Sequence, residues 1–159
     1  ISLGGEKTQA TRLQVDWFRI RRIQEGEDPW YLRIRSTTDG KHEVTWKAKS
    51  ENLGIARKHK EINFFIEDSQ KLAELFMGIG LEKYAHQEKD RTSFSWKNYT
   101  FDIDQYPNMP AYLEIESDSE KSIKSAIQLI GLEKNKTWQK GERILIQEVY
   151  GLDWYNMKF

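Results

Sequence analysis

The sequence predicts an α+β domain in which antiparallel strands form a β-barrel and helices pack outside it. Several segments alternate apolar with charged residues, which is the two-residue period of a β-strand. Polar turn residues between some of these segments are typical of antiparallel hairpins. Two further segments place apolar residues at helical spacing between capping residues and glycines. A chain of 159 residues is long enough for one domain with a sizeable core.

The first two strands are predicted before residue 36. Residues 11–23 favour a strand because β-branched and aromatic residues recur there. In residues 31–35 two apolar side chains face one side, and Arg33 and Arg35 face the other. A hairpin turn is predicted at residues 38–41, where Asp and Gly occur together.

Two more strands and a helix follow the turn. Residues 42–47 form the returning hairpin strand, with Lys47 on its charged face. Residues 57–67 predict one longer strand that carries Glu61 on the face opposite its apolar residues. Residues 70–79 then change to helical spacing. This first helix has a capping residue in front and a glycine behind, namely Asp68 or Ser69, and Gly80.

Three later segments are predicted to be strands, over residues 81–96, 99–104 and 111–116. Each places charged side chains two residues apart, so that the charges of one strand share one face. These charged residues are Lys89 and Arg91, then Asp102 and Asp104, then Glu114 and Glu116.

The last third of the chain is predicted to be mainly helical. A helix through Leu129 begins at Ser117 or Ser119, either of which can cap it, and its apolar stripe is expected to pack on the barrel. Residues 142–150 carry apolar residues that suit a final helix. The opening residues 1–5 are typical of a helix end closed by glycine.

The charged faces have two interpretations. Solvated outer faces of antiparallel sheets commonly carry charges, so any single pair can simply point into solvent. Basic and acidic pairs here occupy separate strands, however, and adjacent carboxylates repel unless a cation lies between them. Mg²⁺ prefers carboxylate oxygens, and guanidinium groups bind phosphate oxygens in pairs. The pattern therefore favours a barrel with a polar interior that binds a triphosphate and a divalent metal.

The composition argues against several other classes. Lys and Arg total 25, as do Asp and Glu, which gives no support to nucleic acid or an anionic membrane as partner. No apolar run is long enough to cross a bilayer. The chain has no Cys, which excludes thiol chemistry and fits a reducing compartment. We therefore expect a cytoplasmic protein.

The order of these motifs resembles the CYTH domains, which include class IV adenylyl cyclases, thiamine triphosphatases and other triphosphate tunnel metalloenzymes. The resemblance covers most of the chain and implies an antiparallel eight-stranded tunnel that holds a small-molecule triphosphate. By position, it implies phosphate contacts and catalytic roles for Arg33, Arg35, Lys47, Lys89 and Arg91. It implies an acidic set that binds Mg²⁺ or Mn²⁺, namely Glu61, Asp102, Asp104, Glu114 and Glu116.

The resemblance also sets the expected function. Members of the family begin with a strand of the pattern Glu-x-Glu-x-Lys, which is not in this sequence, so residues 1–159 are expected to form one N-terminally truncated domain. A metal-dependent triphosphatase is favoured because water is the least demanding nucleophile. A cyclase forming cyclic AMP from ATP is the first alternative. A non-catalytic barrel for a phosphorylated ligand is the second, since His59 and Asn63 stand where the family often has Glu. The oligomeric state is open and includes a homodimer.

Overall fold

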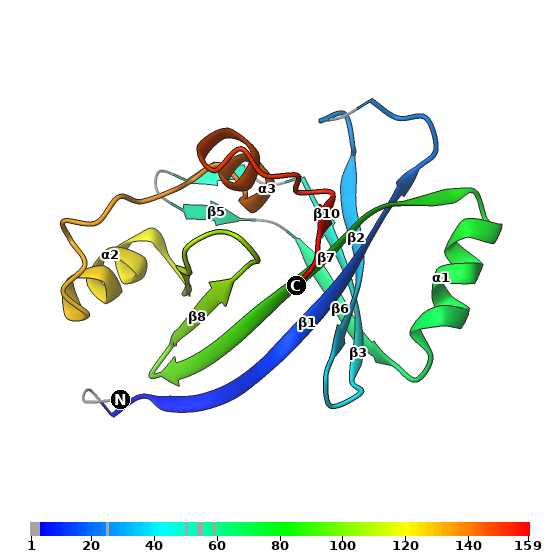
Figure 1. Ribbon diagram of the computed structural model, residues 1–159. Helices are drawn as coiled ribbons and strands as arrows, with labels where there is room; N and C mark the ends of the chain where they lie inside the picture. The colour runs from blue at the N-terminus through cyan, green and yellow to red at the C-terminus, as the bar shows by residue number, and fades with distance from the viewer. Residues whose placement is uncertain (1–3, 25, 50, 54–55, 59) are drawn as a thin grey trace.

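One strongly curved antiparallel sheet forms the body of the protein (Figure 1). The computed structural model describes residues 4–24, 26–49, 51–53, 56–58 and 60–159. Seven strands are paired in the order β6-β3-β2-β1-β7-β8-β9, and β10 pairs with β7 in parallel. The strands are β1 (Glu6–Ile20), β2 (Trp30–Thr37), β3 (His42–Ala48), β6 (Glu61–Ile66), β7 (Leu81–Trp96), β8 (Tyr99–Gln105), β9 (Tyr112–Glu116) and β10 (Asn156–Met157).

The two longest strands, β1 and β7, run side by side along nearly their whole length. Strand β1 begins at Glu6, before the predicted start at residue 11. Its first residues are polar and exposed, so β-propensity alone does not mark them as strand. Cross-strand pairing with β7, for example Glu6 opposite Ser95, extends the strand to this point.

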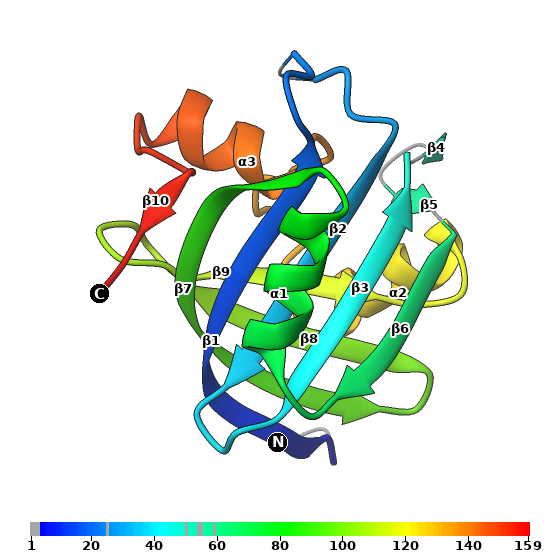
Figure 2. The same ribbon diagram turned by 90° about the vertical axis from the view of Figure 1, so that its right-hand side faces the viewer.

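The sheet curls round a shared interior without closing into a hydrogen-bonded ring. Strands β6 and β9 end the pairing order, and no ladder joins them in the described part of the chain. Both strands nevertheless contribute side chains to one cavity, Glu61 from β6 and Glu116 from β9. Figure 2 shows β8 and β9 crossing behind β3 and β6. The structure therefore confirms an antiparallel sheet that curves round a polar interior, as predicted. It does not confirm that the sheet closes into a hydrogen-bonded barrel.

The single strand predicted over residues 57–67 is wrong. Strand β5 (Ala56–Lys58) pairs with β4 (Glu51–Leu53) in a separate two-stranded sheet, whereas β6 begins at Glu61 and pairs with β3. The chain thus changes its pairing partner between Lys58 and Glu61, which apolar alternation does not reveal. His59, which the prediction placed on the face of Glu61, lies outside the described residues.

The predicted helices are confirmed. Helix α1 (Ser69–Gly78) begins at Asp68, whose side chain accepts a hydrogen bond from the Lys71 N–H. Helix α2 (Glu120–Leu129) is capped in the same way by Ser119. The final helical segment consists of α3 (Glu142–Ile144) followed by the π-helical turn η1 (Leu145–Val149). No helix among the residues described could cross a membrane.

Two apolar clusters support the sheet from different sides. Phe18, Leu32, Ile34 and Val44 form a cluster under α1. A second cluster joins Ala85 of β7 to the connection between β8 and β9 and to the C-terminal segment, with these buried members: Tyr106, Met109, Ile146, Trp154 and Met157. Because Leu32 and Ile34 alternate with Arg33 and Arg35, burial of the apolar face under α1 turns the arginines toward the cavity.

We expect Phe18→Ala to unfold the α1 side of the sheet. Phe18 is 1% exposed and its ring packs edge-on against Phe76 of α1, with centroids 5.1 Å apart. Loss of this side chain should lower the free energy of unfolding by about 3–5 kcal/mol, measured by urea denaturation. Ile20→Ala, two residues along on the same strand and 43% exposed, should cost less than about 1 kcal/mol. Equal effects would contradict this packing.

Candidate functional site

A cavity of about 1140 Å³ lies inside the curved sheet, closed on one side by the α3 segment. The predicted basic residues Arg33, Arg35, Lys47, Lys89 and Arg91 all line it. Four of the predicted acidic residues, Glu61, Asp102, Glu114 and Glu116, line it too. Asp104 is fully buried behind Lys89 and Arg91. The charged faces therefore point inward, and the interpretation of them as a solvated outer surface is wrong.

Arg91 occupies the space between the carboxylates of β8 and β9. Its Nη1 lies 2.7 Å from Asp102, and its Nη2 lies 2.6 Å from Asp104 and 3.0 Å from Glu114. Asp102 and Glu114 stand directly opposite one another in the strand register, where like charges would repel. Burial lowers the pKa of Arg91, but the hydrogen bonds and charge of Asp104 outweigh it and raise the pKa. Arg91 thus supplies the cation that the acidic pairs need.

Lys89 joins the sheet to the C-terminal segment through Glu142. Its Nζ lies 2.7 Å from Asp104 and 2.9 Å from Glu142. The hydroxyls of Tyr106 and Tyr112 also donate to Glu142. Burial raises the pKa of Glu142, but the charge of Lys89 and the two tyrosine hydrogen bonds outweigh it and bring the pKa to about 2. Glu142 is therefore a carboxylate in the site.

Sequence reasoning missed Glu142. It assigned this residue only to the start of a helix, where an acidic side chain is favoured by the helix dipole in any protein. The residues that make Glu142 part of the site are Lys89, Tyr106 and Tyr112, which belong to distant strands and loops. No local signal in the sequence distinguishes the two roles.

Two further ion pairs lie across neighbouring strands. Arg35 Nη2 lies 2.6 Å from Glu43, directly opposite it on β3. Lys47 Nζ lies 2.6 Å from Glu61, opposite it on β6. Burial raises the pKa of Glu61, but the hydrogen bonds from Lys47 and Asn63 outweigh it, so that the pKa is lowered. Both basic residues thus face the cavity while already bound to a carboxylate.

Arg33 differs from the other basic residues because the described part of the chain offers it no carboxylate within ion-pair distance. Its Nε is buried and has no hydrogen-bond partner there. Burial, and then the charge of Arg35, lower the pKa of Arg33. A partly buried guanidinium without a counter-ion is destabilising, and an anion placed in the cavity would offset that cost.

Two acidic side chains also lack part of the compensation that a buried carboxylate needs. Asp102 Oδ1 is buried without a hydrogen-bond partner in the described part of the chain. Burial of its carboxyl and the charge of Glu114 raise the pKa of Glu116, which lies at the rim of the cavity. A cation beside these oxygens would satisfy both, so they fit a divalent metal together with Glu114. Among the described residues, however, no group of three or more acidic or His side chains is already arranged to hold one.

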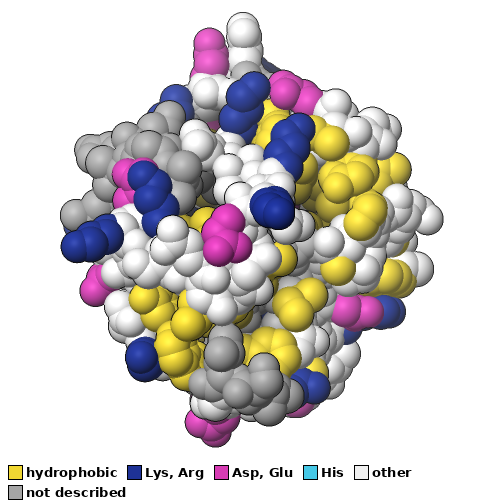
Figure 3. Space-filling model, turned by 90° about the vertical axis from the view of Figure 1, so that its left-hand side faces the viewer, with side chains coloured by type: hydrophobic (Ala, Val, Ile, Leu, Met, Phe, Trp, Pro, Cys, Tyr) yellow, Lys and Arg dark blue, Asp and Glu magenta, His cyan; other side chains and the backbone are white. Residues whose placement is uncertain are grey.

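The face of the molecule in Figure 3 carries charges of both signs. Figure 3 shows Lys and Arg side chains interspersed with Asp and Glu on one face, with no large area of a single sign. The basic side chains that are gathered together lie inside the cavity. The face in Figure 3 therefore lacks the extended basic surface that a polyanion binds, while the basic residues of the cavity suit a small anion.

Comparison with known proteins is consistent with this geometry. The sequence profile of the CYTH domain matches residues 14–142. Among solved structures, the PH1012 protein of Pyrococcus horikoshii superposes with a TM-score of 0.73 at 21% identity, over 88% of this chain and 85% of that one. A comparison by sequence with curated proteins gave no match.

Two structural neighbours carry functional descriptions. A protein of Vibrio parahaemolyticus, described as a candidate adenylate cyclase, has a TM-score of 0.72 at 12% identity, over 90% of this chain and 84% of that one. A candidate adenylyl cyclase from Hippeastrum, for which a dominant triphosphatase activity is described, has a TM-score of 0.62 at 12% identity and the same coverage. At these identities the likeness shows a shared fold.

The low pKa of Glu142 predicts a loss of stability in acid. Its folded pKa of about 2 lies below the ordinary 4.5, so its contribution is present above pH 4.5 and lost as the pH falls toward 2. That contribution is on the order of 3 kcal/mol. Glu142→Gln should flatten the fall in unfolding free energy across this range, measured by urea denaturation at several pH values. Glu133→Gln, at an exposed position, should keep the wild-type slope. Parallel slopes in all three proteins would refute it.

Proposed function

The chain belongs to the CYTH domain family, and we propose that it is a metal-dependent triphosphatase that releases phosphate from an inorganic or organic triphosphate. The observation that carries this proposal is Arg33, a cavity-lining guanidinium without a counter-ion among the described residues. The other predicted basic residues, Arg35, Lys47, Lys89 and Arg91, line the same cavity, so an anion with several charges can contact more than one of them. A triphosphate has this charge and an extended shape.

The ion pairs of the cavity suit exchange with such a ligand. Arg35 and Lys47 each bind one carboxylate across a strand pair, on side chains that are still partly exposed to the cavity. Phosphate oxygens can replace or share these contacts without moving the strands. Arg91 and Lys89 are held more tightly, by several carboxylates each, and therefore serve to position their end of the ligand.

Glu114 and Glu116 are the residues we expect to hold Mg²⁺ or Mn²⁺, with the free oxygen of Asp102 beside them. When bound, the metal would neutralise phosphate charge and promote ionisation of water. The other acidic candidates have different roles in this proposal. Glu61 keeps Lys47 in place, and Asp104 orients Lys89 and Arg91.

Hydrolysis requires few groups beyond those that bind. The oxygen of water forms a bond to the terminal phosphorus, the bond from that phosphorus to the bridging oxygen breaks, and the shortened polyphosphate leaves with the electron pair. The proton of the attacking water passes to the departing phosphate or to solvent. The basic side chains that line the cavity would stabilise the charge that develops on the phosphoryl oxygens. The description of the Hippeastrum neighbour supports hydrolysis over cyclisation.

A second candidate is a barrel that binds a phosphorylated ligand without turnover. It is favoured by one observation: Arg91 already neutralises Asp102, Asp104 and Glu114, and the described residues offer no ready group of three metal ligands. The two candidates differ in product formation and agree on binding.

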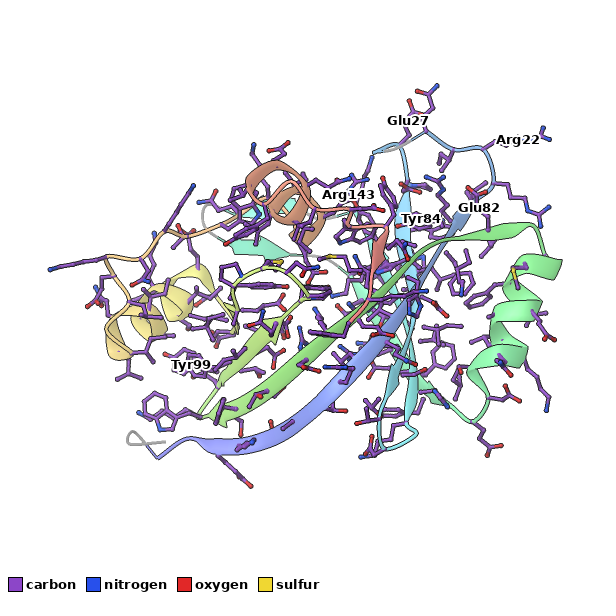
Figure 4. The ribbon with its side chains drawn as sticks, in the orientation of Figure 1. Arg22, Glu27, Glu82, Tyr84, Tyr99 and Arg143 are labelled. Carbon is purple, nitrogen blue, oxygen red and sulfur yellow. The ribbon has the colours of Figure 1, made fainter. Side chains whose placement is uncertain are left out.

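We expect Arg33→Met to weaken triphosphate binding by about 10- to 100-fold, the effect of losing a hydrogen-bonded charge contact. Calorimetry with tripolyphosphate and ATP, with and without Mg²⁺ or Mn²⁺, measures the affinity. Assays for phosphate and cyclic AMP on the same samples separate hydrolysis, cyclisation and binding alone. Arg22→Met, on an exposed loop away from the cavity, is the matched control (Figure 4). Unchanged affinity in the Arg33 variant would refute the proposed site.

Glu116→Gln tests the metal. If Glu116 holds the cation, this change should reduce phosphate release by at least about 100-fold in Mg²⁺ or Mn²⁺, because metal assistance contributes several kcal/mol to the transition state. Affinity for tripolyphosphate in a chelator should stay within about threefold, since the charge removed is not a phosphate contact. A variant that retains full turnover excludes Glu116 as a metal ligand. Retained binding without turnover in the wild type supports the binding barrel instead.

A further inference from the structure

Three hydrogen-bond donors converge on the carboxylate of Glu142, and we propose that they form a phosphate subsite that this carboxylate occupies until a ligand displaces it. The donors are the Lys89 ammonium and the hydroxyls of Tyr106 and Tyr112. A triphosphate bound in the cavity would take over their hydrogen bonds and release the segment that carries Glu142. On the proposed function, on which this inference rests, the two tyrosines therefore contact the substrate.

The three donors suit a phosphate oxygen as well as a carboxylate oxygen. Lys89 Nζ lies 2.9 Å from Glu142 Oε2, and the Tyr106 hydroxyl lies 2.6 Å from Glu142 Oε1. Tyr112 donates to Oε2 beside Lys89. The two tyrosine rings are stacked with centroids 6.5 Å apart. Burial, and then the charge of Glu142, raise the pKa of both tyrosines, so both keep the proton that they donate. An ammonium and two hydroxyl donors can bind any oxyanion.

Glu142 reaches these donors on a separate part of the chain. Lys89 lies on β7, Tyr112 begins β9, and Tyr106 lies in the connection between β8 and β9. A long connection from α2 leads to Glu142 (Figure 1). Its residues 133–141 contain no helix, strand or buried side chain. Because no buried side chain anchors this stretch, the hydrogen bonds of Glu142 hold it beside the cavity.

The chain is anchored in the core again at Ile146. This side chain is fully buried and belongs to the same apolar cluster as Trp154. Between Glu142 and this anchor lie α3 and the start of the π-helical turn η1. Turns of this kind are rare and are found mostly at functional sites. Residues 133–145 can therefore move away from the cavity while Ile146 keeps the end of the chain in place.

A triphosphate can compete with Glu142 because it also reaches Arg33. Burial and the charge of Arg35 lower the pKa of Arg33, and the charge of Glu142 opposes them, so Glu142 and Arg33 are neighbours. A ligand that extends from Arg33 to Lys89 gains contacts with both, whereas Glu142 forms an ion pair with Lys89. Phosphate beside an ionised carboxylate is repelled, so Glu142 leaves the donors when the ligand takes them.

Hydrogen–deuterium exchange of the wild-type protein, with and without tripolyphosphate and in the absence of divalent metal, tests the displacement. We expect the ligand to raise the exchange rate of residues 133–145 by at least about threefold, because loss of the Glu142 contacts releases them. Strands that contact the ligand should be protected, and α1, on the outer side of the sheet, should not change. A segment that only walls the cavity would be protected as well, and that result would overturn the inference.

Calorimetry on two variants tests the subsite. Glu142→Gln removes the competing charge and should bind tripolyphosphate about tenfold more tightly than wild type. Adding Tyr112→Phe to it should weaken binding by about three- to tenfold, since phosphate loses a donor. Tyr99→Phe, distant from Arg143 in Figure 4, is the control for the tyrosine and should have no effect.

Weaker binding by a folded Glu142→Gln protein would overturn the inference, because Glu142 would then support the ligand instead of competing with it. Unchanged affinity on adding Tyr112→Phe would overturn it too, because Tyr112 would then serve only to hold Glu142. The exchange experiment on the wild type needs no variant to fold. Absence of any tripolyphosphate binding would instead refute the proposed function itself.

Discussion

The structure depends on one electrostatic constraint: the inner face of the sheet carries many charges, and each must be neutralised where water is scarce. The Arg91 guanidinium shows how this is done, because it lies within 3.0 Å of carboxylates from both β8 and β9. Removal of such a cation would leave buried carboxylates facing one another. The same requirement accounts for Lys89 between Asp104 and Glu142, and for the cross-strand pairs of Arg35 and Lys47. The described residues provide no counter-ion for Arg33, so the interior of the sheet can bind an anion there.

The position of the apolar residues follows from this constraint. Side chains alternate in direction along β2 and β3, so charges that point inward leave Leu32, Ile34 and Val44 pointing outward. These apolar side chains must be shielded from water. Helix α1 provides it. On β1 the inner face is apolar, and the C-terminal segment packs against this region through Ile146 and Trp154. The two helical segments therefore have different tasks: α1 buries the outer face, while the C-terminal segment closes the cavity and contributes Glu142 to it.

Much of this could be predicted from the sequence, because strand alternation and helix caps are local signals. They assigned the inward face of β2 and the starts of α1 and α2, and they placed Arg33, Arg35, Lys47, Lys89 and Arg91 on faces that do line one cavity. Contacts between distant residues could not be predicted in this way. The partner change after Lys58 depends on which strand each segment meets. Glu142 joins the site only through Lys89 and two tyrosines from other elements, and the open edge between β6 and β9 reflects how far the sheet curls.

The distribution of partners within the cavity gives the ligand a direction. At one end, Lys89 and Arg91 are saturated by carboxylates, so a phosphate bound there would compete with groups of the protein itself. At Arg33 there is no such competitor in the described part of the chain, and the anion gains the full benefit of neutralising a desolvated guanidinium. The strongest single phosphate contact should therefore form at Arg33, next to Trp17, and weaker contacts should follow toward Arg91 and Glu114. A metal ion at the acidic end would reverse that weakness, because it adds positive charge beside carboxylates that otherwise repel phosphate. On this argument, binding is anchored at the arginine end, and metal determines whether the far phosphate is held in place for reaction.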